Sequence, residues 1–133
     1  MFEDIGKLIL RLNIGILMLF HGIFKIIDGI NGVSGLIEGM GLPAWISYGV
    51  FLGEVLAPIM LIIGFRVKIA SILIIFTMLM AIFALTSGNI FILNEKSGGW
   101  IVELQGLYLF GALAIMFLGS GRFALDIKMK KSK

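Results

Sequence analysis

The sequence predicts an all-α integral membrane protein, a four-helix bundle in a single domain with both termini in the cytoplasm. Of its 133 residues, 59% are hydrophobic and 14% are charged, whereas soluble proteins contain about 25% charged residues. In water, a globule of this size buries only about two-thirds of its surface. This number of apolar side chains therefore requires a bilayer. The chain also contains four apolar stretches of about 20 residues, the length needed to cross a hydrocarbon core of about 30 Å.

The four predicted spans account for most of the domain, which covers residues 1–133. They are residues 5–27, 44–65, 69–86 and 98–118. Only the turn Arg66–Lys68 separates the second and third spans, so these two helices should form an antiparallel hairpin. The outer loop Asp28–Pro43 contains five glycines around a short apolar run, which predicts turns and a short segment at the membrane surface. This Gly-rich loop is either a lid over a site or a simple connector.

The basic residues predict the orientation. Of the eleven Lys and Arg residues, only Lys25 and Lys96 fall on the outer side of the predicted spans. Because cytoplasmic loops retain positive charge, we expect a multi-pass protein of a bacterial or archaeal cytoplasmic membrane with both termini inside. Residues 126–133 carry four lysines and form a basic cytoplasmic tail at the anionic inner leaflet. Arg11, near the inner end of the first span, is interpreted as an interface anchor.

The composition excludes several kinds of chemistry. Cysteine is absent and histidine occurs once, which removes disulfides, thiolate nucleophiles, zinc–thiolate sites and iron–sulfur ligation by this chain. We therefore expect no metal or haem bound by this chain alone. The net charge is +3, but the basic residues lie at span ends without the interleaved aromatics of a nucleic-acid-binding face. The predicted partner is the lipid bilayer and not a nucleic acid.

Ionisable side chains inside the predicted spans mark the candidate site, because such groups are costly at membrane depth and are commonly functional. Glu54 lies near the middle of the second span, roughly 15 Å from either surface at about 1.5 Å per residue. His21 and Lys25 lie one turn apart on the first span, and Glu103 lies at a matching depth on the fourth. We predict that these four residues form an interior polar cluster that opens toward the outer side. Gln105 is a further candidate for ligand binding.

Small residues beside this cluster predict close helix packing. Gly15 and Gly22 lie on the charged stripe of the first span. Gly49, Gly53 and Ala57 form a ridge of small residues at four-residue spacing, which lets another backbone approach. An alternative stays open, in which the polar cluster is a closed hydrogen-bonded network that only fixes the packing of the helices.

Short motifs of glycine and charged residues are spread along the chain. They are Arg11 with Gly15, His21-Gly22-x-x-Lys25, Gly41-Leu42-Pro43, Gly53-Glu54, Gly64-Phe65-Arg66, Gly98-Gly99 with Glu103, and Gly119-Ser120-Gly121-Arg122 ending at Asp126. Their order and spacing resemble those of the DoxX family of small four-helix bacterial membrane proteins, over nearly the whole chain. One departure is Ala124, where relatives commonly have serine, so any role of a hydroxyl at that position is absent.

The resemblance implies a role in membrane redox chemistry. Related chains form the membrane subunits of thiosulfate:quinone oxidoreductase, and others are associated with thiol or oxidative-stress systems. The implied function is a quinone-linked component of a redox system, with an interior pocket for the quinone and a redox partner protein. His21, Lys25 and Gln105 would bind the ligand. Glu54 and Glu103 would transfer the protons that quinone reduction consumes. Whether the chain is itself an enzyme stays open.

Two other classes of function also stay open. In the first, the chain is a non-enzymatic partner or assembly subunit of another enzyme, which predicts a lipid-facing patch of small residues and no enclosed cavity. In the second, it is a small-solute transporter, which requires an oligomer because four short helices rarely suffice alone. A homodimer is compatible with all three functions.

Overall fold

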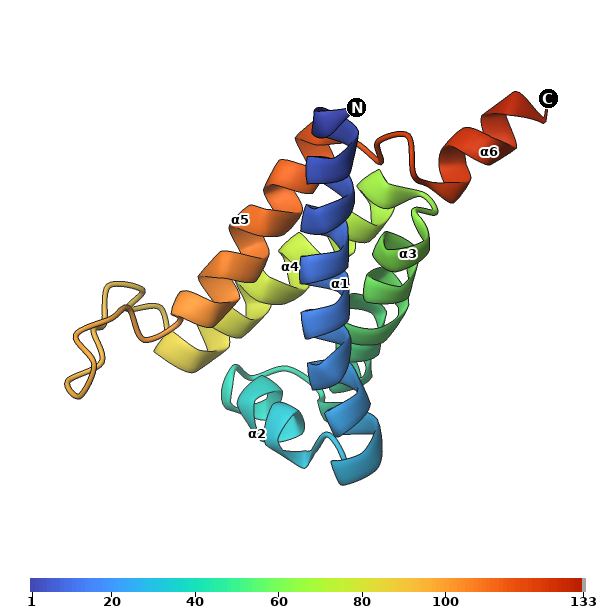
Figure 1. The fold of residues 1–133 in the computed structure, drawn as a ribbon. Helices are drawn as coiled ribbons and strands as arrows, with labels where there is room; N and C mark the ends of the chain where they lie inside the picture. The colour runs from blue at the N-terminus through green and yellow to red at the C-terminus, as the bar shows by residue number, and fades with distance from the viewer. Residues whose placement is uncertain (133) are drawn as a thin grey trace.

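The computed structural model describes residues 1–132, which form a bundle of helices (Figure 1). The helices are α1 (Phe2–Asp28), α2 (Asn31–Gly39), η1 (Ala44–Gly49), η2 (Leu52–Leu56), α3 (Ala57–Ile63), α4 (Val67–Thr86), α5 (Glu103–Leu118) and α6 (Leu125–Lys131). Within this described part of the chain, the only β-pairing is an isolated bridge between Leu93 and Trp100. The predicted all-α class is confirmed.

Three segments are long and apolar enough to cross a membrane. They are α1, α4 and the run Ala44–Ile63, which η1, η2 and α3 form together. The fourth apolar helix, α5, has 16 residues, which corresponds to about 24 Å at 1.5 Å per residue. Large apolar side chains cover the outside of the bundle, for example Phe76 (66% exposed), Phe110 (64%) and Phe117 (76%). So extensive an apolar surface is unfavourable in water and is suited to lipid.

The last apolar helix begins later than the predicted residue 98. Between α4 and α5, the amide of Asn94 donates to the carbonyl oxygen of Gly99 at 2.7 Å, and the amide of Gly98 donates to Asn94 at 2.8 Å. Gly98 has a φ of +72°, which glycine adopts without steric cost. These backbone groups bond within a loop that projects beyond the ends of α4 and α5 (Figure 1). They cannot also extend a helix, so α5 begins at Glu103.

Two glycines let α1 closely approach the second apolar segment, Ala44–Ile63. A Cβ at Gly15 would lie 3.0 Å from the carbonyl oxygen of Pro58, and one at Gly22 would overlap the carbonyl oxygen of Glu54. Both glycines lie on the buried face of α1, which also carries Met18. Close backbone approach therefore sets the position of α1 along η2 and α3.

The predicted ridge of small residues divides into two parts. Gly53 faces α4, where an added Cβ would overlap the side chain of Thr77, and Ala57 is fully buried. Gly49, by contrast, has no atom of the described residues within 4 Å of an added Cβ. Gly53 and Ala57 therefore lie at helix contacts, whereas Gly49 does not pack against a helix.

The two termini lie at the same end of the bundle (Figure 1), where the segment before α6 contacts α1. The amide of Arg122 donates to Asp4 at 3.0 Å. Arg11 is fully buried, and its Nη2 donates to the carbonyl oxygen of Phe123 at 2.6 Å. The interpretation of Arg11 as an interface anchor is therefore wrong, because its side chain reaches the C-terminal segment and not the membrane surface.

Asp126 caps α4 from a distant part of the sequence. Its carboxylate accepts hydrogen bonds from the amides of Arg66 (2.9 Å) and Val67 (3.4 Å), and its own amide donates to Gly64 at 3.0 Å. Amides at the start of a helix have no partner within the helix, so this carboxylate satisfies two of them. This explains why α4 begins at Val67, two residues before the predicted boundary.

Replacing Asp126 with alanine should lower the free energy of unfolding by about 1–2 kcal/mol, the usual cost of losing a helix cap. Hydrogen exchange should accelerate in the first turn of α4, while the middle of the helix stays protected. Thermal unfolding in detergent and exchange mass spectrometry measure the two effects. Glu95→Ala, at an exposed carboxylate in the loop before α5, is the control. Equal exchange rates in the two variants would contradict the capping role.

Candidate functional site

A cavity of about 610 Å³ lies in the half of the bundle away from the termini. Residues of α1, α2, η1, η2, α4 and α5 form its wall, which is mostly apolar. The polar side chains that line it are His21, Lys25, Asp28, Ser47, Glu54, Thr77, Gln105 and Tyr108. A space of this size matches the range of small-molecule sites, about 300–1,000 Å³.

An ion pair forms part of the cavity wall. Nζ of Lys25, on α1, donates to Oε2 of Glu54, on η2. The side chain of Glu54 is 7% exposed and that of Lys25 is 23% exposed. An unpaired charge at membrane depth is costly, so each side chain compensates the charge of the other. The structure therefore joins two of the four residues of the predicted polar cluster directly.

The helix around Glu54 has an unusual hydrogen-bond pattern. The amide of Ala57 donates to Leu52, five residues earlier, which makes η2 a single π-helical turn. Pro58 has no amide hydrogen, so it cannot donate to the carbonyl of Glu54 in the α-helical pattern. Turns of this kind are rare and often occur at functional sites. The wide turn ends directly before Ala57 and Pro58, where this hydrogen bond is missing.

His21 and Gln105 lie on facing helices of the cavity. His21 is one turn before Lys25 on α1, and its ring meets the ring of Tyr108 edge to face, with 5.9 Å between centroids and 84° between planes. Gln105 is one turn before Tyr108 on α5, and both line the cavity. The side chains of α1 and α5 therefore present hydrogen-bonding groups to the same space.

Glu103 lies outside the cavity. Its side chain is exposed, and its carboxylate lies beside Gly99 in the preceding loop. At about 100° per residue, Glu103 is roughly 200° around the helix from Gln105, on the opposite face of α5. Its depth matches the sequence prediction, but the helix turns its side chain away from His21, Lys25 and Glu54.

Besides Tyr108, three further polar residues line the cavity, and the sequence interpretation did not assign them to the site. Asp28 follows Lys25 by three residues on α1, and Thr77 lies in the middle of α4, where its hydroxyl donates to Leu73 at 2.8 Å. Ser47, on η1, lies 2.9 Å from the hydroxyl of Ser34 on α2. The three-residue spacing of Asp28 and the central position of Thr77 in an apolar span are signals that could have identified them.

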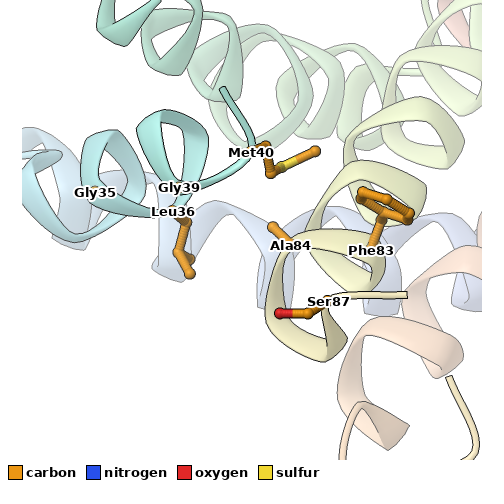
Figure 2. Close-up of a pocket in the computed structure, with 7 residues that line it drawn as sticks. All are labelled: Gly35, Leu36, Gly39, Met40, Phe83, Ala84 and Ser87. Atoms are coloured by element: carbon orange, nitrogen blue, oxygen red, sulfur yellow. The ribbon is translucent and has the colours of Figure 1, made fainter. Parts of the chain in front are cut away.

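A smaller pocket of about 350 Å³ lies between α2 and the end of α4 (Figure 2). Its lining residues are Gly35, Leu36, Gly39, Met40, Phe83, Ala84 and Ser87. Leu36 and Ala84 also line the large cavity. The two spaces are therefore neighbours that share part of their walls.

The arrangement suits an apolar ligand that carries a hydrogen-bond acceptor. Lys25 has three N–H donors, and the hydrogen bond to Glu54 uses one of them. The surrounding wall is mostly apolar. In residues 1–132, no group of three or more His, Cys, Asp or Glu side chains is placed to hold a metal ion.

These features define a small helical membrane protein with a buried ion pair in the wall of an apolar cavity. The chain belongs to the DoxX family, whose model matches residues 6–87. This range includes α1 to α4 and both members of the ion pair. The resemblance inferred from the motifs is thus confirmed.

A curated relative covers almost the whole chain. It is "Putative oxidoreductase CatD" of Bacillus subtilis (strain 168), which is 27% identical over 130 residues, or 98% of this chain and 91% of the relative. No solved structure matches the chain significantly.

Proposed function

We propose that this protein is a quinone-binding component of a membrane redox system. The observation that carries this proposal is the ion pair of Lys25 and Glu54 in the wall of a mostly apolar cavity of about 610 Å³. A quinone combines a flat apolar ring with carbonyl oxygens that accept hydrogen bonds. Membership of the DoxX family and a relative named as an oxidoreductase support the same function.

Each polar side chain of the cavity has a proposed role. The ammonium group of Lys25 retains donors beyond the one bonded to Glu54, and it donates to a quinone oxygen. His21 and Gln105 offer further hydrogen bonds from α1 and α5. Glu54 transfers protons to the reduced ring, whereas the exposed position of Glu103 excludes it from direct transfer.

The overall reaction defines the partner. Reduction of a quinone to a quinol consumes two electrons and two protons. The side chains of the cavity supply the proton path, and a redox partner protein with its own electron carrier supplies the electrons. The protein lies in the cytoplasmic membrane of a bacterium or archaeon with its termini inside, in agreement with the nine of its eleven Lys and Arg residues that fall on the inner side of the predicted spans. In this orientation the cavity occupies the outer half of the membrane.

Native mass spectrometry of protein extracted gently from its own membrane tests the proposal. Wild-type protein should carry an adduct with the mass of a quinone, and Glu54→Gln should lose at least about nine-tenths of it, a tenfold loss of affinity. Without the carboxylate, Lys25 loses the charged acceptor that holds its ammonium group at the cavity wall. Glu103→Gln, the matched control, should keep the adduct.

Two outcomes would contradict the proposal. Bare protein in every sample, or protein bound only to another polypeptide, would argue against quinone binding and for an assembly subunit. An equal adduct in the wild type and Glu54→Gln would remove Glu54 from the site. The same spectra report the oligomeric state.

A further inference from the structure

We propose that the smaller pocket between α2 and α4 is the exit path for the apolar tail of the ligand in the large cavity. This inference rests on the proposed function and extends it. The ligand is then a membrane quinone with a long alkyl or isoprenoid chain, and not a tail-less aromatic. The ring lies at the ion pair, and the chain leaves through the smaller pocket, whose lining residues Figure 2 shows.

The two spaces are adjacent in the fold and share part of their walls. Leu36 of α2 and Ala84 of α4 line both of them. Among residues 1–132, the lining of the smaller pocket comes from α2, from Met40 directly after α2, from the end of α4 and from Ser87 directly after α4. A chain that leaves the large cavity at these shared residues therefore passes between α2 and α4.

The positions of the ion pair and of the smaller pocket along α4 fit a ligand that has a polar head group and an apolar tail. The contact between Gly53 and Thr77 places the turn that contains Glu54 beside Thr77 of α4. Ala84 follows Thr77 by seven residues, which is about 10 Å along the helix axis. A ring held by the ion pair thus lies about two helical turns from the pocket, and a flexible apolar chain can span that distance.

Two glycines leave open space on the α2 side of the pocket. Gly35 and Gly39 lie one turn apart on α2 and line the pocket. A Cβ added at either position would meet no atom of the described chain within 4 Å. On the α4 side, Phe83 supplies apolar surface (Figure 2). A large side chain at either glycine would therefore fill the pocket without a clash.

The test compares two probes that share one head group. They are a decyl-substituted benzoquinone and the same benzoquinone without the alkyl chain, and Kd is measured by quenching of tryptophan fluorescence in lipid nanodiscs. The variants are Gly35→Phe and Gly39→Phe. Gly6→Phe, at a position of α1 with open space and outside both pockets, is the matched control. Each probe partitions into the lipid equally with every variant, so this partitioning cancels when the Kd of a variant is divided by the Kd of the wild type.

We expect Gly35→Phe and Gly39→Phe to weaken binding of the decyl quinone at least about tenfold, because a head group cannot enter the site when its tail has no exit. Binding of the tail-less quinone should change less than about twofold, and Gly6→Phe should affect neither probe. If both probes bind the wild type and the two plugging variants bind the decyl quinone normally, the exit path is wrong while quinone binding stands. If neither probe binds the wild type, the proposed function fails as well.

Discussion

Replacing Lys25 with methionine is expected to lower the free energy of unfolding by about 3–5 kcal/mol, because this change leaves a buried carboxylate without its partner. Glu54 is 7% exposed in its side chain, and Lys25 donates to it directly. The same variant should lose measurable quinone binding, since it removes the ammonium donor. Unfolding in mixed detergent micelles and quenching of tryptophan fluorescence by quinone measure the two effects.

A double variant distinguishes the effect of the unpaired carboxylate from the effect of changed side-chain packing. In Lys25→Met/Glu54→Leu no charge stays unpaired, so most of the lost stability should return, while quinone binding should stay absent. Lys96→Met, in the exposed loop before α5, should match the wild type in both measurements. If the double variant is no more stable than Lys25→Met, the instability does not come from the unpaired carboxylate.

Gly22→Ala should have the second-largest effect, a loss of at least about 2 kcal/mol of stability. The added Cβ would overlap the carbonyl oxygen of Glu54 and lie 2.7 Å from Cγ2 of Val55. Backbone cannot give way as a flexible side chain can, so α1 must move away from η2. The movement should also separate Lys25 from Glu54 and weaken quinone binding.

Gly6→Ala is the matched control for this prediction. Gly6 lies on the same helix, and a Cβ there meets no atom of residues 1–132 within 4 Å. Because alanine favours a helix over glycine by about 0.5–1 kcal/mol, Gly6→Ala should be neutral or slightly stabilising. Equal stability of Gly22→Ala and Gly6→Ala would show that α1 does not depend on this close approach.

The helices themselves were largely predictable, because each depends on local composition. The first span was expected at residues 5–27 and forms Phe2–Asp28, and the third was expected at 69–86 and forms Val67–Thr86. The early start of α4 was not predictable, because its cap is Asp126, about 60 residues away. The late start of α5 depends on hydrogen bonds within the loop at Gly98, which compete with the helix.

The candidate site was predictable as a set of residues but not as a geometry. Depth along a span follows from sequence position, so Glu54 could be placed near the middle of its span and Lys25 near the end of its own. The sequence does not show which face of a helix meets its neighbours, and residues two positions apart lie about 200° apart around the helix. Glu103 shows this effect, because it lies at the expected level of α5 but on the face opposite Gln105.

By itself, the sequence determined that this chain is helical, that it needs a bilayer and that its few buried charges are the candidate site, because apolar length and the cost of charge in lipid are local properties. Only the tertiary structure decided that Lys25 is the partner of Glu54 and that Arg11 holds the C-terminal segment. It also decided that a cavity lies beside the ion pair. These outcomes depend on how closely the backbones approach at Gly22 and Gly53, and that distance is a property of packed helices and not of any one helix.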